Sequence, residues 1–409
     1  MNQRLSVRLY GKQVGLLEQT KTGKLQFTYE DLNDVAISNS LPLEKKTFSD
    51  KECKPYFNGL LPESDTVRKH IGKMFGINSN NDFALLKAIG DDCAGALSLH
   101  DINEPIQVKE FIELEATPQT DEQFAKHIKE LPNKPFFTEL SNEVRLSLAG
   151  TQDKGAVTII DGKICLPKNN TPTTHIVKPL IRNLENTILN EYLCMKVAKA
   201  IGINTAQVEM CKVKDVQYLL IERYDREVKD NKIKRIHQED FCQALSVLSL
   251  SKYQADGGPD IKKCFDLLDI TKSPANSRNM LMKLIIFNFL TGNNDAHAKN
   301  FSLLYFKKKP VLAPAYDLLS TQIYPNLTKK MAMKIGSGYE KKFVTKSGFE
   351  KMCEDINYSY KMFTKEFEEI ADKLPQMLEK EVLSLDRKFS GTVVQKIKSV
   401  ITENSKINL

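Results

Sequence analysis

An apolar run from Met280 to Leu290 constrains the fold of this chain more than any other stretch. Its composition predicts a helix that is buried on most sides, because few of its positions could face water. Gly292 follows the run, and glycine commonly occupies the first position beyond the end of a helix. The helix is therefore expected to deliver the polar loop 293–300 beside a hydrophobic core.

A hairpin is predicted directly after this loop. Residues 300–306 and 311–315 have strand patterns, and the turn between them contains lysines and a proline. The second strand brings Asp317 toward the loop that carries Asp295 and Asn300. Carboxyl and amide oxygens beside a core are costly unless a cation lies among them. Since Mg²⁺ prefers oxygen ligands and leaves room for phosphates, the sequence predicts a magnesium–phosphate site.

The spacing of these residues points to phosphoryl transfer. Asp295 and Asn300 fit D-x-x-x-x-N, the interval of protein-kinase catalytic loops, where the Asp meets the substrate hydroxyl and the Asn holds metal. Asp317 lies where a kinase keeps its second metal carboxylate. No H-R-D precedes the loop, however, and no D-F-G surrounds Asp317. The interval alone is common by chance, so a solvated polar loop is the alternative.

Composition indicates a soluble globular protein of two or three domains. The chain has 409 residues, of which 41% are hydrophobic and 27% charged. No apolar run approaches the ~20 residues of a membrane helix, and the start lacks a signal peptide, so a cytoplasmic protein is expected. The eight cysteines contain no C-x-x-C pair and are interpreted as buried thiols. The charge of +7 would favour contact with nucleic acid or an acidic partner without identifying either.

Patterning predicts an α+β protein in three parts. Residues 1–110 form a β-rich subdomain for regulation or partner binding, because strand alternation fills their first third. Residues 111–224 form an α/β lobe, and residues 225–409 form a mainly helical lobe. The expected helices of this last part include residues 238–248, 260–268 and 280–290, and three more after Ser347, which is spaced from Glu350 as in a capping box.

Two further features bear on phosphate binding. Gly150 and Gly155 lie in a loop whose backbone N–H groups could cradle phosphate, with a plain hairpin turn as the alternative. Lys178 ends a strand, and Glu191 lies on an apolar face of the next helix, where a carboxylate favours a cationic partner. A strand lysine paired with a helix glutamate holds nucleotide phosphates in protein kinases.

With these stretches assembled, the sequence resembles the HipA family, the serine/threonine kinase toxins of bacterial toxin–antitoxin pairs. The matching stretches run in family order over nearly the whole chain. They are residues 57–62, 147–154, 175–178, 190–194, 222–226, 238–243, 252–259, 295–302 and 316–317.

The resemblance implies a two-lobed fold close to protein and lipid kinases, with ATP and Mg²⁺ as cofactors. It makes Asp295 the catalytic residue and Asn300 and Asp317 the metal ligands, and it makes Ser147 an autophosphorylated serine whose modification silences the kinase. From the residues themselves, Glu191 is expected to pair with Lys178. The implied ATP-binding residues are Ala149, Gly150, Thr151, Gln152, Asp153, Lys154, Lys178, Glu222, Arg223, Tyr224, His297, Lys299 and Tyr316.

The resemblance also implies partners. These are a helix-turn-helix antitoxin, operator DNA reached through the antitoxin, and a protein substrate such as an aminoacyl-tRNA synthetase. No membrane is implied, and nucleoid association would accompany antitoxin binding. Two other functions stay open: a small-molecule phosphotransferase such as an antibiotic kinase, and a non-catalytic co-repressor.

Overall fold

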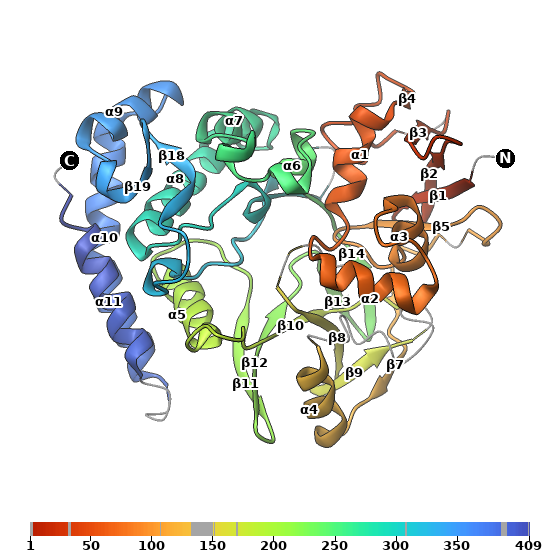
Figure 1. The fold of residues 1–409 in the computed structure, drawn as a ribbon, viewed down its shortest axis with the longest axis horizontal. Coiled ribbons are helices and arrows are strands. Elements are labelled where there is room, and N and C mark those ends of the chain that lie inside the picture. The colour runs from red at the N-terminus through yellow and green to blue at the C-terminus, as the bar shows by residue number, and fades with distance from the viewer. Residues whose placement is uncertain are drawn as a thin grey trace. The chain divides into compact units, whose positions relative to one another are not determined.

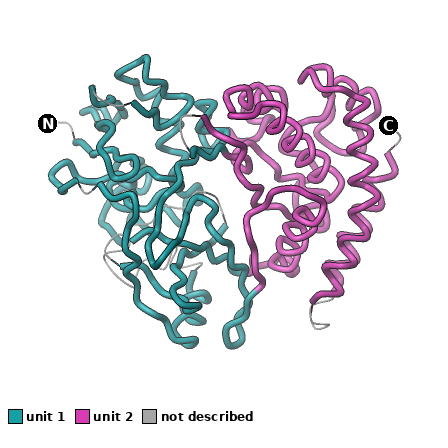
Figure 2. The backbone as a smooth tube through the Cα atoms, turned by 180° about the vertical axis from the view of Figure 1, so that it is seen from behind, with its two compact units in different colours: residues 1–179, 211–250, 303–308 teal, residues 180–210, 251–302, 309–409 magenta. Residues whose placement is uncertain are grey.

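The computed structural model describes residues 3–31, 34–106, 108–131, 150, 152–168, 171–306, 309–385, 391–407 and 409. They gather into two compact units, each assembled from separated stretches of the chain (Figure 2). Unit 1 holds residues 1–179, 211–250 and 303–308; unit 2 holds residues 180–210, 251–302 and 309–409. Helices and sheets mix in this chain as predicted, while the boundaries at residues 110 and 224 stay a prediction.

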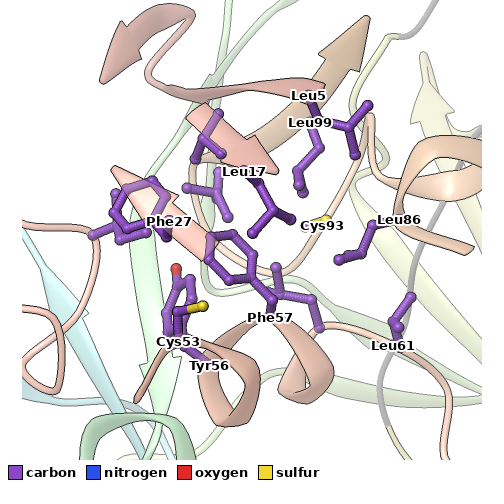
Figure 3. Close-up of a cluster of buried hydrophobic side chains, with 14 of the residues drawn as sticks. Leu5, Leu17, Phe27, Cys53, Tyr56, Phe57, Leu61, Leu86, Cys93 and Leu99 are labelled. Atoms are coloured by element: carbon purple, nitrogen blue, oxygen red, sulfur yellow. The ribbon is translucent and has the colours of Figure 1, made fainter. Parts of the chain in front are cut away.

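Unit 1 begins with an antiparallel sheet covered by helices (Figure 1). The strand order is β4-β3-β2-β1-β5, which confirms the predicted meander. The strands are β1 (Gln3–Leu9), β2 (Lys12–Gln19), β3 (Leu25–Tyr29), β4 (Thr47–Phe48) and β5 (Leu97–Asp101), and the helices are α1 (Asp50–Gly59), α2 (Asp65–Phe75) and α3 (Asp82–Ile89). Leu5 pairs with Leu17, and Leu17 with Phe27, so the three side chains share one face and are fully buried (Figure 3).

A second sheet, of order β11-β12-β10-β8-β9-β7, completes the core of unit 1. Its strands are β7 (Ala116–Pro118), β8 (Gly155–Ile160), β9 (Lys163–Pro167), β10 (His175–Pro179), β11 (Val208–Val213) and β12 (Val216–Glu222). Helix α4 (Asp121–Glu130) packs on it through Phe124, whose ring meets that of Tyr218 edge-on at 5.3 Å. Neither α2 nor α4 was predicted, because each buries only a narrow apolar stripe among polar residues.

Short elements follow β12: β13 (Arg226–Lys229), β14 (Lys232–Arg235), which pairs with β6 (Ile112–Glu113), then β15 (His237–Asp240) and α6 (Phe241–Ala244). The helix predicted over residues 238–248 is therefore wrong. Its first residues form a strand, and Asp240 caps a single turn by accepting from Gln243 N at 2.9 Å. Ser246 then has φ +56°, which a helix interior does not accommodate.

Unit 2 is mainly helical and is built around one long buried helix. Its elements are α5 (Thr187–Ala200), α7 (Ile261–Leu267), α8 (Pro274–Thr291), β17 (Val311–Leu312), β18 (Lys330–Ile335), β19 (Gly338–Glu340), α9 (Lys346–Asp355), α10 (Tyr360–Leu383) and α11 (Thr392–Asn404); β16 (Ser302–Tyr305) begins in this unit. Helices α10 and α11 pack against α8 (Figure 1). The Phe289 ring of α8 lies 5.3 Å from that of Phe349 in α9 and 6.1 Å from that of Phe367 in α10.

Two predictions for unit 2 have clear outcomes. No side chain from Leu281 to Leu290 is exposed, so the predicted buried helix is confirmed. The capping box predicted for Ser347 and Glu350 is wrong. Thr345 is the N-cap of α9, and its hydroxyl accepts a hydrogen bond from Gly348 N at 3.3 Å.

Within the described parts of the chain, no helix is long and apolar enough to cross a membrane. All eight cysteines are free thiols; Cys211 is half-buried and the others are buried. The expectation of buried thiols is therefore met.

Glu239 of β15 gives unit 1 a pH-dependent stability. Burial raises its pKa from 4.5 to about 7, although Ser38 Oγ, Asn39 N and Tyr305 Oη donate to its carboxyl at 2.5, 3.0 and 2.5 Å and favour the charged form. The folded state then binds this proton more tightly than the unfolded state. The contribution is present at low pH and is lost as the pH rises from about 5 through 7.

We expect Glu239→Gln to remove this dependence, because the amide stays neutral and fills the same space. The slope of unfolding free energy between pH 5 and 7 should flatten by up to about 1.4 kcal/mol per pH unit. Urea unfolding at several pH values measures it. A slope that is the same in both proteins would contradict the assignment.

Candidate active site

The end of α8 places the polar loop. Gly292 has φ +75°, and a Cβ on it would lie 2.6 Å from Val400 Cγ1 and 2.8 Å from Gln322 Cβ. Glycine is thus required here by both conformation and space. The Gly292 carbonyl accepts from Gln322 N at 3.0 Å and from Thr321 Oγ1 at 3.2 Å. The predicted helix stop is confirmed, and it is anchored from outside the helix.

Asparagine side chains shape the loop itself. Asn293 Oδ1 accepts from Asp295 N at 3.1 Å, and its Nδ2 donates to Asn288 Oδ1 at 3.0 Å. Asn294 N donates to Thr321 Oγ1 at 2.7 Å, and its carbonyl accepts from Ala332 N of β18 at 2.8 Å. Asp295 is therefore presented on a turn whose backbone is hydrogen-bonded on both sides.

The structure brings Asp295 and Asn300 together. Asn300 Nδ2 donates to the Asp295 carbonyl at 3.0 Å, across the short turn Ala298–Asn300. The Asp295 carboxylate accepts a hydrogen bond from Tyr253 Oη, with 2.6 Å between Oη and Oδ1. Both predicted residues are half-buried, which leaves them partly reachable from solvent.

The backbone before and at Asp317 is constrained. The strand before it is fixed because Ala315 N donates to Asn204 O at 2.8 Å and Ala315 O accepts from Ala206 N at 2.9 Å. Asp317 then has φ +58°, a left-handed conformation that non-glycine residues rarely adopt and that is enriched at functional sites.

The pKa of His297 is shifted by charged side chains near the loop. Burial, together with the positive charges of Lys252 and Lys299, lowers its pKa to about 3, while the negative charge of Asp317 opposes the shift. His297 is therefore neutral at physiological pH, and these three charged side chains lie within electrostatic reach of it. Tyr316, also predicted here, donates from Oη to the Lys299 carbonyl at 2.6 Å.

The donor set fits a magnesium–phosphate group. Asn300 and Asp317 offer an amide and a carboxylate oxygen, and Mg²⁺ commonly takes one or two such ligands together with waters and phosphates. Within the described residues there is no cluster of three or more His, Cys, Asp or Glu side chains that could hold a metal alone. His297 Nδ1 is buried without a hydrogen-bond partner in the described structure. A buried polar atom usually has a partner, so a bound polar group would satisfy it.

The predicted phosphate loop and lysine lie in unit 1. Lys178 is in β10 and only 7% exposed. Lys154 Nζ donates to the Gln152 carbonyl at 2.7 Å, and Gly150 has φ +105°. Asp153 is half-buried beside them. Ser147, Ala149 and Thr151 lie outside the described residues.

Glu191 is 4% exposed in α5 of unit 2. The Lys178–Glu191 pair stays a prediction, because the two residues belong to different units.

Of the implied ATP-binding residues, Glu222, Arg223 and Tyr224 lie together at the end of β12, and their side chains have different surroundings. Glu222 ends β12 and is exposed, and Tyr224 Oη donates to Gln238 Oε1 at 2.5 Å. The Arg223 guanidinium is 3% exposed and points into the core of unit 1. Its backbone N–H donates to Thr174 O at 2.9 Å and its carbonyl accepts from Arg226 N at 3.1 Å, so both main-chain groups of Arg223 are also paired within unit 1.

Arg223 belongs to a buried ionic cluster that the sequence did not reveal. Asp92 Oδ2 lies 3.3 Å from Arg223 Nη1, and Asp92 Oδ1 lies 2.8 Å from Arg226 Nη2 and 3.4 Å from Arg235 Nη2. Asp225 Oδ2 contacts Arg223 Nη2 at 3.0 Å and Arg226 Nη1 at 2.9 Å. Burial would raise the pKa of Asp92, but the three arginines hold it well below its usual range.

The chain matches two family models, which together cover most of its length. The family model described as the HipA-like C-terminal domain matches residues 146–381, and that described as the HipA N-terminal domain matches residues 5–100. Y4mE of Sinorhizobium fredii, whose name designates a kinase, is 42% identical over 340 residues, covering 81% of this chain and 80% of that protein. The serine/threonine-protein kinase toxin HipA of Shewanella oneidensis is 26% identical over 363 residues, covering 85% and 81%.

Among solved structures, the Shewanella oneidensis complex of HipA, HipB and operator DNA matches with a TM-score of 0.86. At 23% identity it covers 98% of this chain and 97% of that one. This likeness confirms the predicted fold class.

Proposed function

Because the chain belongs to the HipA family, we propose that it transfers the γ-phosphate of ATP to a serine or threonine hydroxyl of a protein, and so acts as a growth-inhibiting toxin. One observation carries the proposal. The loop after α8 brings Asp295 and Asn300 together, and Asp317 and the buried Lys299 lie within electrostatic reach of its neutral His297. Such a set offers oxygen ligands for a metal and donors for phosphates, on the loop itself and at Asp317 after the hairpin.

Each of these residues has its own role in the proposed phosphoryl transfer. Asn300 and Asp317 would hold Mg²⁺, which neutralises phosphate oxygens when bound. Lys299 adds positive charge that is effective because its side chain is buried. Asp295 orients the attacking hydroxyl; since an aspartate is a weak base at neutral pH, alignment is its larger role.

The test that separates this proposal from a small-molecule phosphotransferase uses labelled ATP. The purified protein, Mg²⁺ and ATP labelled at the γ-phosphate are incubated with a bacterial lysate, and the proteins are separated from small molecules. Label on protein serine or threonine is the expected result. Label confined to small molecules would favour an antibiotic-kinase type of activity, and no transfer at all would favour a non-catalytic co-repressor.

We expect Asp317→Asn to weaken Mg²⁺-dependent ATP binding at least about 10-fold, because it removes the charged metal ligand. Asparagine tolerates the left-handed conformation of Asp317 about as well as aspartate does, so the backbone should be unchanged. Calorimetric titration with ATP, with and without Mg²⁺, measures the effect. Equal Mg²⁺-dependent affinity in both proteins would remove Asp317 from the metal site.

The proposal extends to partners and regulation. The solved relative is a complex with HipB and operator DNA, which supports a helix-turn-helix antitoxin and operator DNA as partners here. We further propose an aminoacyl-tRNA synthetase as substrate and autophosphorylation at Ser147. Phosphate on Ser147 would add about two negative charges, which would repel the phosphates of ATP. Mass spectrometry of the protein incubated with and without ATP tests the modification.

A further inference from the structure

We propose that Tyr253 is a positioning residue for the catalytic aspartate. It lies in residues 251–258, the Tyr253 loop, to which the mechanism above gives no role. The inference rests on the proposed kinase function and adds a residue to it. The phenolic oxygen of Tyr253 lies 2.6 Å from Asp295 Oδ1, and the hydroxyl donates a hydrogen bond to the carboxylate.

The Tyr253 loop is built to hold that hydroxyl in one place. The Tyr253 carbonyl accepts from Asp256 N at 3.0 Å and from Gly258 N at 2.9 Å, which closes a tight double turn. Gly257 has φ +88°, and a Cβ on Gly258 would lie 2.3 Å from the Ser251 carbonyl oxygen. The two glycines are therefore required for the chain to fold back this closely.

One strand supports both the Tyr253 loop and the catalytic loop. In β18, Lys334 N donates to Gln254 Oε1 at 2.8 Å, and Ala332 N donates to Asn294 O at 2.8 Å. The loop that carries the donor hydroxyl and the loop that carries the accepting carboxylate are thus both hydrogen-bonded to the same short strand. This shared support explains how a loop more than thirty residues before Asp295 can meet it at a defined distance.

The Tyr253 ring is packed independently of its hydroxyl. It meets the His297 ring edge-on, with 5.2 Å between centroids and 83° between planes, and Lys252 Nζ lies 5.5 Å from its centroid. Phenylalanine would keep both ring contacts and lose the hydrogen bond to Asp295. Tyr253→Phe therefore tests the hydroxyl while the ring stays in place.

A hydrogen bond from a neutral donor to a carboxylate is strong and directional. It selects one rotation of the Asp295 side chain, and the attacking hydroxyl must find the carboxylate in that orientation. Other charged or titratable groups around the loop include Lys252, His297, Lys299 and Asp317. These groups are the same in the wild type and in Tyr253→Phe. A difference in rate between the two proteins would therefore not come from them.

The experiment measures kcat and KM for ATP in the full-length wild type and in Tyr253→Phe, using label transfer to protein. We expect kcat to fall about 10- to 100-fold, as for loss of a hydrogen bond to a charged group, with KM for ATP within about twofold. The matched control is Tyr358→Phe, which removes a hydroxyl that donates to Glu366 at 3.0 Å in the same unit. That control should keep wild-type kcat.

A double-mutant cycle with Asp295→Asn completes the test. If the hydroxyl acts through the carboxylate, Tyr253→Phe adds little to the loss caused by Asp295→Asn. Unchanged kcat in Tyr253→Phe, a change in KM alone, or additive losses in the cycle would each overturn the inference. Failure of the proposed function is distinguishable, because the wild type itself would then transfer no label to protein.

Discussion

Replacing Asp295 with asparagine is expected to lower the rate of phosphoryl transfer about 10³-fold, which is typical for loss of a positioned acid–base group. Asparagine has nearly the same shape, and its amide oxygen can still accept from Tyr253 Oη. In the proposed mechanism, the substitution removes only the negative charge that aligns the attacking hydroxyl and receives its proton. Initial rates of label transfer from ATP to protein measure the effect.

The control for this prediction is Asp355→Asn. Asp355 ends α9 in the same unit and forms an exposed ion pair with Lys351 at 2.8 Å. Both variants should unfold at the wild-type temperature, and only Asp295→Asn should lose activity. An Asp295→Asn protein whose rate lies within about tenfold of wild type would contradict the assigned role.

Asp92→Ala should produce the largest loss of stability. The substitution leaves Arg223, Arg226 and Arg235 close together with Asp225 as the remaining carboxylate of the buried ionic cluster. Removing one partner of a buried ion pair typically costs about 3–5 kcal/mol, because an uncompensated charge stays buried. Since the chain has no tryptophan, urea unfolding is best followed by circular dichroism.

The matched control is Asp31→Ala. Asp31 is 80% exposed and pairs with Lys46 at the surface of the same unit. Exposed ion pairs contribute little to stability, so this variant should unfold at the wild-type urea concentration. Equal behaviour of the two alanine variants would show that the cluster is not a source of stability.

The sequence predicts the parts of the site that local patterns encode. The apolar run before Gly292 predicts a buried helix that ends at this glycine, and the structure confirms both the helix and its end. The meander of the first thirty residues is likewise set by alternation in the strand period and by turn residues. Asp295 and Asn300 come together because they lie on one short loop.

Contacts between distant segments could not be predicted in this way. The resemblance makes Arg223 an ATP-binding residue, yet its guanidinium is buried against Asp92, a carboxylate far earlier in the chain. Tyr253 carries no local signal for its hydrogen bond to Asp295 beyond the two glycines that follow it. Residues 238–240 have a composition compatible with a helix, but they lie in strand β15. Here the tertiary environment outweighs the local propensity of the residues.

The central claim is that Asn300 and Asp317 hold magnesium while Asp295 faces the transferred phosphate. A crystal structure of the protein with Mg²⁺ and a non-hydrolysable ATP analogue tests it most directly. We predict a metal within about 2.1 Å of an oxygen of each ligand, the γ-phosphate beside Asp295, and a partner on His297 Nδ1. Metal and phosphates bound elsewhere, with Asp317 turned away from Asn300, would contradict the account.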